Sequence, residues 1–323
     1  MTALLLVLLL GLGLVAVGAG GSWVVRRSAP VLVRVPRLAA GLLLATATLW
    51  VLTLLALGPM LSWVNDGPAV LTGAAGEVCQ RCLASANPFG GTTMTTVVPT
   101  VALLGIPLLG GVALVAAGVA EARRRRRRTK AVAAGITGVP ATVLGHQVLL
   151  VPDDRAQVFA LPARHGGIIL SEGCRTALAP EELAAVLAHE QAHLRQHHHL
   201  ITLLTAALVR GLGWVPLLAA VRTALPLYLE IAADDAARRS VGTPALASAL
   251  LRLGNREDSA PFGGSTAEAL HAAGPDRIRH LVCPPEAGGR GPAVAVAALL
   301  AGLAVVNAAV HLPLLLAAWD GCL

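Results

Sequence analysis

Two histidines and a glutamate in the second half of the chain have the types and the spacing of a metal site. His189 and His193 are four residues apart, and Glu190 directly follows the first histidine. On a helix, side chains four residues apart share one face, with about 5–6 Å between their Cβ atoms, so both imidazoles can reach one ion. Glu190 would lie on the neighbouring sector, where it can take a proton from a water molecule. The H-E-x-x-H pattern therefore predicts a Zn2+ site with its own general base, and a histidine-rich helix surface without metal is the competing interpretation.

A catalytic zinc site usually has three protein ligands, so a third residue must join the two histidines. Glu230 is the better candidate, because it begins the short helical pattern Glu230-Ile-Ala-Ala-Asp234 after a long apolar stretch. Asp234 shares its helix face and would accept a hydrogen bond from a ligand imidazole; the alternative is an ordinary exposed acidic helix start. His199 has the spacing of a third histidine ligand, but Gln196 stands where that extended pattern needs a helix-breaking glycine. We therefore interpret residues 197–199, all histidines, as a solvated helix end.

The helix that must carry the two histidines has a recognisable start. Pro180 suits a first helical turn, and Glu181 and Glu182 favour the positive end of the helix dipole. Apolar residues then recur at helical spacing, namely Leu183, Val186, Leu187 and Leu194. The spacing predicts an amphipathic helix with its apolar stripe on a protein core.

Upstream of this helix, short runs rich in β-branched residues predict a small antiparallel sheet. They cover residues 142–151, 157–161 and 167–170, and Pro, Asp and Gly turn signals separate them. Residues 121–290 are the part of the chain with mixed polar and apolar patterning. We therefore expect an α+β domain there.

The remainder of the chain is apolar enough for a membrane protein, since 55% of all residues are hydrophobic. Uncharged stretches long enough to cross the roughly 30 Å hydrocarbon core occupy residues 3–25, 38–64, 97–120 and 293–319. The first three form an N-terminal membrane part, residues 1–120, and the fourth closes the chain. We expect about four transmembrane helices, with the polar Asn307 and His311 of the last one facing other helices.

Positive charge sets the expected orientation. Arginines cluster between the first two spans and again at residues 123–128, whereas the loop of residues 65–96 has only Arg81. Positive loops stay inside, which places the N-terminus outside and residues 121–290 in the cytoplasm. A net charge of +7 then reflects topology, and with only 3% aromatic residues we expect no direct nucleic-acid binding.

The apolar stretch of residues 200–229 needs a separate interpretation. Arg210, Pro216, Arg222 and Pro226 interrupt it, so its uninterrupted runs are about half a span. A single crossing would also separate Glu230 from His189. We therefore expect a hydrophobic hairpin that packs against the sheet or dips into the cytoplasmic leaflet.

Together these segments resemble the integral-membrane gluzincin peptidases of the BlaR and MecR type, and the HtpX-type proteases are similar. The resemblance is carried by residues 159–171, 183–194, 230–234 and 276–281 and covers about residues 143–284. Its most specific motif is H-E-x-x-H followed by E-x-x-x-D, and the arrangement of three spans before the domain and one after it also fits. BlaR-type receptors carry an extracellular penicillin-sensing domain after the last span; this chain ends soon after its own, so we expect no such sensing domain.

The resemblance implies roles for particular residues. His189, His193 and Glu230 would be the zinc ligands, Glu190 the catalytic base, and Asp234 the partner of a ligand imidazole.

The resemblance also implies how substrate is held. The segment near Phe159–Ile168 would form an edge strand that receives the substrate as an added strand. Candidates for stabilising the oxyanion are His271, Arg277 and His280, with a structural role as the alternative for each. The close pair Cys79 and Cys82 favours a local disulfide or idle thiols over a metal site.

The expected fold class is thus membrane α-helical with a cytoplasmic α+β gluzincin metallopeptidase domain. The expected function is a membrane-bound zinc endopeptidase that hydrolyses a cytoplasmic protein, such as a transcriptional repressor in a signalling pathway. A quality-control protease for membrane proteins and a non-proteolytic zinc-binding receptor or scaffold are the alternatives. Glu190 argues against the scaffold, because a purely structural zinc site needs no base.

Overall fold

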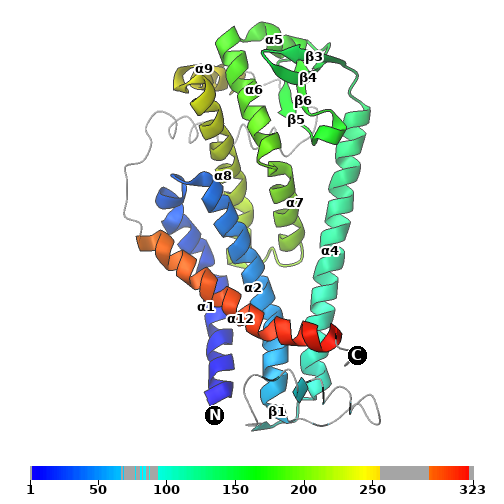
Figure 1. The fold of residues 1–323 in the computed structure, drawn as a ribbon, viewed down its shortest axis with the longest axis vertical. Coiled ribbons are helices and arrows are strands. Elements are labelled where there is room, and N and C mark those ends of the chain that lie inside the picture. The colour runs from blue at the N-terminus through cyan, green and yellow to red at the C-terminus, as the bar shows by residue number, and fades with distance from the viewer. Residues whose placement is uncertain are drawn as a thin grey trace.

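A computed structural model describes residues 2–66, 94–254 and 291–319, with a few isolated residues between 67 and 93. Long helices form a bundle, and a small domain with a four-stranded sheet sits at the end of the bundle opposite the N-terminus (Figure 1). At the other end, the two-residue strands β1 (Asn65–Asp66) and β2 (Met94–Thr95) pair in parallel. The chemistry predicted from the sequence falls within the small domain and the helices next to it.

The described part of the chain has four helices long and apolar enough to cross a membrane. They lie in α1 (Thr2–Leu32), α2 (Pro36–Val64), α4 (Thr100–Ala134) and α8 (Pro216–Val241). A fifth long helix, α12 (Gly291–Trp319), contains the apolar stretch Leu300–Pro313. The bundle is therefore compatible with insertion into a membrane by length and composition.

The helix α8 departs from the expectation of a stretch broken by prolines. Pro216 lies in its first turn, where a missing N–H costs nothing, and Pro226 lies inside a continuous helix. The preceding helix α7 (His198–Val209) has 12 residues and rises about 18 Å, less than the roughly 30 Å of a hydrocarbon core. The chain thus reverses at residues 210–215, after a helix shorter than a membrane span, and α8 runs back from there.

This α7–α8 hairpin packs among the long helices rather than on the sheet. The helix α8 lies against α1 and α2, and α7 lies against α4. Gly21 allows α1 to lie close against α8, since a Cβ at this position would be only 2.5 Å from the Leu217 side chain. Burial of apolar side chains holds the group together, and the buried members include Leu43, Trp50, Leu218, Val221 and Leu225. The part of α8 that leads up to Glu230 is thereby fixed to the bundle.

The helix α12 crosses α1 and α2 obliquely in Figure 1 and is tied to α2 by polar groups. The Asn307 amide donates a hydrogen bond to the Thr53 hydroxyl at 2.8 Å, and His311 Nε2 lies 3.2 Å from the carbonyl of Leu52. The expectation that these polar residues face other helices is confirmed.

The sheet contains β3 (Val139–Val143), β4 (His146–Val151), β5 (Val158–Ala160) and β6 (Ile168–Ser171) in the order β3-β4-β6-β5. The expected antiparallel sheet is wrong in one respect, because β4 and β6 pair in parallel. The chain passes to the far edge to form β5 and reverses at Gly166 and Gly167, both with positive φ. All four residues of β6 are buried, as befits an interior strand.

Among the described residues, three helices join the sheet in this domain: α5 (Glu172–Ala177), α6 (Pro180–Arg195) and α9 (Thr243–Gly254). The predicted helix start is confirmed, since Pro180 occupies the first turn of α6. Residues from the sheet and from these helices share one core, which includes Val148, Ile168, Leu170, Cys174, Val186, Leu187 and Ala249. The apolar stripe of α6 faces this core, so its opposite side is left for the polar residues.

Glu182 anchors the start of α6 and gives a stability prediction. Its carboxylate accepts from the Ala179 backbone N–H at 2.9 Å and from the Ser248 hydroxyl, and it pairs with Arg252 at 3.0 Å. These three partners, the Ser248 hydrogen bond foremost, hold the pKa of Glu182 below its usual value. We expect Glu182→Ala to lower the free energy of unfolding at neutral pH by roughly 1–3 kcal/mol.

The pH dependence of this effect has a definite sign. A lowered pKa in the folded state stabilises the protein above the ordinary glutamate pKa of about 4.3, and the stabilisation disappears as the pH falls through the lowered value. Denaturant unfolding of the purified protein at pH 7 and at pH 3, with the exposed neighbour Glu181→Ala as control, measures this. An equal loss of stability for both variants at pH 7 would contradict the anchoring role.

Candidate zinc site

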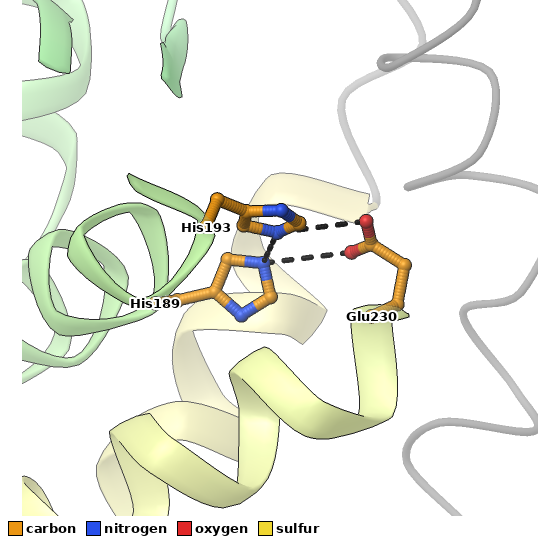
Figure 2. Close-up of side chains that lie close together, drawn as sticks. All are labelled: His189, His193 and Glu230. Carbon is orange, nitrogen blue, oxygen red and sulfur yellow. Dashed lines mark hydrogen bonds and ion pairs between the residues drawn. The ribbon is translucent and has the colours of Figure 1, made fainter. Parts of the chain in front are cut away.

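The helices α6 and α8 pack together and bring the predicted ligands to one place. His189 and His193 project from α6 and Glu230 from α8, and the three side chains converge (Figure 2). The two Nε2 atoms are 3.0 Å apart. His189 Nε2 lies 3.5 Å from Glu230 Oε2, and His193 Nε2 lies 3.5 Å from Glu230 Oε1. Two residues one helical turn apart thus meet a third that is 37 positions further along the chain.

These three side chains fit a zinc ion. Two imidazole nitrogens and one carboxylate oxygen form a donor set typical of catalytic zinc. Ligand atoms about 2.0–2.1 Å from a tetrahedral centre are about 3.3 Å apart. Here the two Nε2 atoms are 3.0 Å apart, each lies 3.5 Å from a different oxygen of Glu230, and one ligand atom from each residue falls within 4.8 Å of the others. Among the described residues, the histidine, cysteine and acidic side chains that could share an ion are those of His189, His193 and Glu230.

Asp234 lies one turn after Glu230 on the same face of α8. Its Oδ1 is 2.9 Å from His189 Nδ1, and its side chain is 1% exposed. A carboxylate at this distance can accept a hydrogen bond from Nδ1–H, which keeps the proton on Nδ1 and directs the Nε2 lone pair toward His193 and Glu230. The next residue, Asp235, pairs instead with Arg238 at 3.2 Å.

Glu190 is buried, with 4% of its surface exposed. As the residue after His189 it is turned about 100° around the axis of α6. A buried carboxylate on this sector of the helix would be suited to accept and return a proton at an ion held by the neighbouring histidines.

His198 is a residue of this site that sequence reasoning missed. The expectation of a solvated helix end holds for His197 and His199, which are exposed, but is wrong for His198, which is 4% exposed. Its Nδ1 lies 2.9 Å from His193 Nδ1, and its Nε2 lies 3.1 Å from Gln196 Oε1. Burial lowers the pKa of His198 to about 4, so its ring is neutral at pH 7 and has one donor and one acceptor nitrogen.

A turn without glycine explains why His198 was missed. The helix α6 ends at Arg195, and His197 adopts a left-handed conformation with φ 53°. Such a φ is uncommon for a residue other than glycine, and the absence of glycine had argued against a helix break. The break redirects α7 and turns His198 toward His193, while His199 is exposed.

Several residues singled out from the sequence lie outside the described part of the chain. These are the oxyanion candidates His271, Arg277 and His280, the segment 276–281, and the pair Cys79 and Cys82.

Residues 120–259 match the family model of peptidase family M48. This segment is a zinc metallopeptidase domain. The M48 segment contains the whole sheet, α6, α8 and α9, and therefore both helices of the site and His198. Its zinc dependence agrees with the geometry of the His189, His193 and Glu230 cluster. Neither the curated proteins nor the solved structures gave a significant match.

Proposed function

We propose that the protein is a membrane-embedded zinc endopeptidase that hydrolyses peptide bonds of protein substrates on the cytoplasmic side. The observation that carries the proposal is the convergence of one ligand atom each from His189, His193 and Glu230 within 4.8 Å, where the helix of the two histidines also carries the buried Glu190. His189, His193 and Glu230 would hold the ion. A structural zinc site usually has four protein ligands and no base, so this arrangement favours catalysis over the scaffold alternative.

Each residue then has a distinct task. Bound zinc supplies Lewis-acid chemistry that activates water and polarises the scissile carbonyl. Glu190 accepts the proton of the attacking water and delivers it to the leaving amine. Asp234 holds the His189 ring in the tautomer that presents Nε2 to the site, at 2.9 Å from Nδ1.

The edge strand β5 is the proposed support for the substrate. It lies next to α6, the helix of the two histidines, and pairs with β6 on one side. The described residues include no strand on its outer side. An extended polypeptide can add to such an edge by backbone hydrogen bonds, which agrees with the edge strand implied by the resemblance at Phe159; Ile168, in contrast, belongs to the interior strand β6.

The register of β5 identifies which backbone groups are available. The N–H of Leu161 bonds to Gly167, and the N–H of Ser171 bonds to Gln157. Because hydrogen-bonded positions alternate in antiparallel pairs, the backbone groups of Val158 and Ala160 point away from β6. These two residues offer the donors and acceptors that an added strand needs.

Removing the outward N–H of Ala160 should weaken substrate binding without disturbing the metal. We expect Ala160→Pro to raise KM by up to roughly tenfold, the value of one lost hydrogen bond, with zinc content unchanged. Proline is tolerated on edge strands when its N–H would face outward. Ala160→Val keeps the N–H and serves as the matched control in steady-state cleavage of an unfolded protein. Equal KM values for both variants would refute substrate addition at β5.

Charge and helix length support the proposed placement in the cell membrane. The α1–α2 connection and the C-terminal half of α4 lie toward the end of the bundle that carries the M48 segment (Figure 1). The α1–α2 connection lies among the arginines Arg26, Arg27, Arg34 and Arg37. The C-terminal half of α4 contains residues 123–128, which are all arginines. The positive-inside tendency then puts the site in the cytoplasm and the N-terminus outside.

The distance of the site from the tip of the α7–α8 hairpin supports a substrate class. Glu230 follows Pro216 by 14 residues of helix, about 21 Å, so the site stands above the tip of the α7–α8 hairpin. Cytoplasmic proteins, such as a repressor cleaved by a BlaR- or MecR-type peptidase, can approach the site from the side opposite the hairpin tip. The inactive Glu190→Gln variant offers a trap, because proteins retained by it in membranes but not by wild type are substrates. Capture of membrane proteins alone would favour an HtpX-type quality-control role.

A further inference from the structure

A chain of hydrogen bonds connects His193 to the beginning of α2. His198 Nδ1 lies 2.9 Å from His193 Nδ1, and His198 Nε2 lies 3.1 Å from Gln196 Oε1. The same Gln196 oxygen accepts from Arg37 Nε at 2.9 Å. Arg37 is the second residue of α2, far from the M48 segment in sequence. These hydrogen bonds thus join the proposed metal site to the connection between the first two helices of the bundle.

Along this series of hydrogen bonds, every donor meets an acceptor only if the protons are donated in the direction from His193 to Gln196. His193 turns Nε2 toward His189 and Glu230, so its proton belongs on Nδ1, from which it is donated to His198 Nδ1. The His198 proton then belongs on Nε2 and is donated to the Gln196 oxygen. The other end of the Gln196 amide donates to the Ala232 carbonyl of α8 at 3.4 Å, which fixes the orientation of the amide.

We propose that His198 is a positioning residue for His193, and that Arg37, through Gln196, makes zinc affinity depend on the α1–α2 connection. The proposal rests on the proposed metal site. It parallels the place of Asp234 behind His189: each ligand imidazole has a buried partner at Nδ1, 2.9 Å away in both cases. The partner of His193 differs in being connected to the membrane part of the chain.

The expected effects decrease with distance from His193. Loss of a group that orients a metal ligand typically lowers metal affinity roughly 10- to 100-fold. His198→Phe keeps a ring of similar size but has no nitrogen, so we expect an effect in that range. His198→Asn can place an amide oxygen near the position of Nδ1 and should recover most of the affinity. Arg37→Gln removes only the last link and should weaken zinc binding by a smaller factor.

The test is the zinc dissociation constant of the purified full-length protein, measured by competition with a chelator. His199→Phe is the matched control for His198→Phe, because His199 is the exposed next residue. Arg26→Gln is the control for Arg37→Gln. Visible absorption of the Co2+-substituted protein reports the geometry around the ion, and thermal unfolding of the metal-free variants reports folding. The proposal predicts weaker zinc binding and an altered Co2+ spectrum for His198→Phe, with metal-free stability close to that of His199→Phe.

Failure of this inference is distinguishable from failure of the proposed function. If wild type binds zinc tightly and both His198→Phe and Arg37→Gln match their controls, the positioning chain is refuted and the metal site stands. If wild type binds no zinc, the proposed function itself fails. Should His198→Phe not fold, Arg37→Gln decides alone, since its exposed side chain can be replaced without disturbing the core.

Discussion

Glu190→Gln is expected to lower kcat by roughly 10²- to 10⁴-fold, the usual contribution of a general acid–base group, while zinc binding is retained. The amide has the size of the carboxylate but cannot accept a proton from water. The three proposed ligands, His189, His193 and Glu230, are untouched by the change. Steady-state cleavage of an unfolded protein, with the zinc content of the same preparation, measures both quantities.

Glu181→Gln provides the control for this variant. Glu181 lies on the same helix, but its side chain is exposed in the first turn of α6. It should therefore keep the activity of the wild type. Wild-type activity in Glu190→Gln would show that another group acts as the base, and loss of zinc from that variant would show that Glu190 contributes to metal binding.

Glu230→Gln should have the second large effect. This variant is expected to lose its bound zinc, whereas Glu190→Gln loses the general base. An amide oxygen carries no negative charge, and two neutral imidazoles alone do not complete a catalytic site. We expect the zinc affinity to fall by more than the roughly 10- to 100-fold that outer partners contribute, and cleavage to fall with it. Metal analysis after dialysis against a buffered zinc concentration provides the measurement.

The neighbouring acid Asp235 gives the matched comparison. Its carboxylate pairs with Arg238 at 3.2 Å and lies outside the ligand cluster. Asp235→Asn should therefore bind zinc like the wild type. Equal zinc content in Glu230→Gln and Asp235→Asn would remove Glu230 from the ligand set and leave the third ligand to be found.

The parts of this site that could be predicted from the sequence depend on local geometry. His189 and His193 are one turn apart on a helix whose start is marked by Pro180, so their common face follows from the helical period alone. Glu230 and Asp234 have the same spacing on a second helix. That these two helices pack together follows only from the order of the two motifs in the resemblance, since no rule of helix periodicity predicts it. The structure brings His189 Nε2 and Glu230 Oε2 to within 3.5 Å.

The parts that could not be predicted depend on how the chain turns. The parallel pairing of β4 with β6 requires β5 to occupy the far edge, and nothing in three short apolar runs determines strand order. His198 enters the site because His197 takes a left-handed φ of 53°, a conformation that sequence rules assign to glycine. Three adjacent histidines marked the place, but only this turn decides which of them faces His193. The continuous helix α8 likewise tolerates Pro226, where a break was expected.

The most direct test of the central claim is the metal content and peptidase activity of one wild-type preparation, before and after chelation. The purified full-length protein in detergent is assayed against an unfolded model protein, stripped of metal, and then reloaded with zinc. We predict about one zinc ion per chain, in line with a single three-ligand site, loss of cleavage on removal, and recovery when about one equivalent is returned. Cleavage that persists in the metal-free protein, or a folded wild type that binds no zinc, would contradict the account.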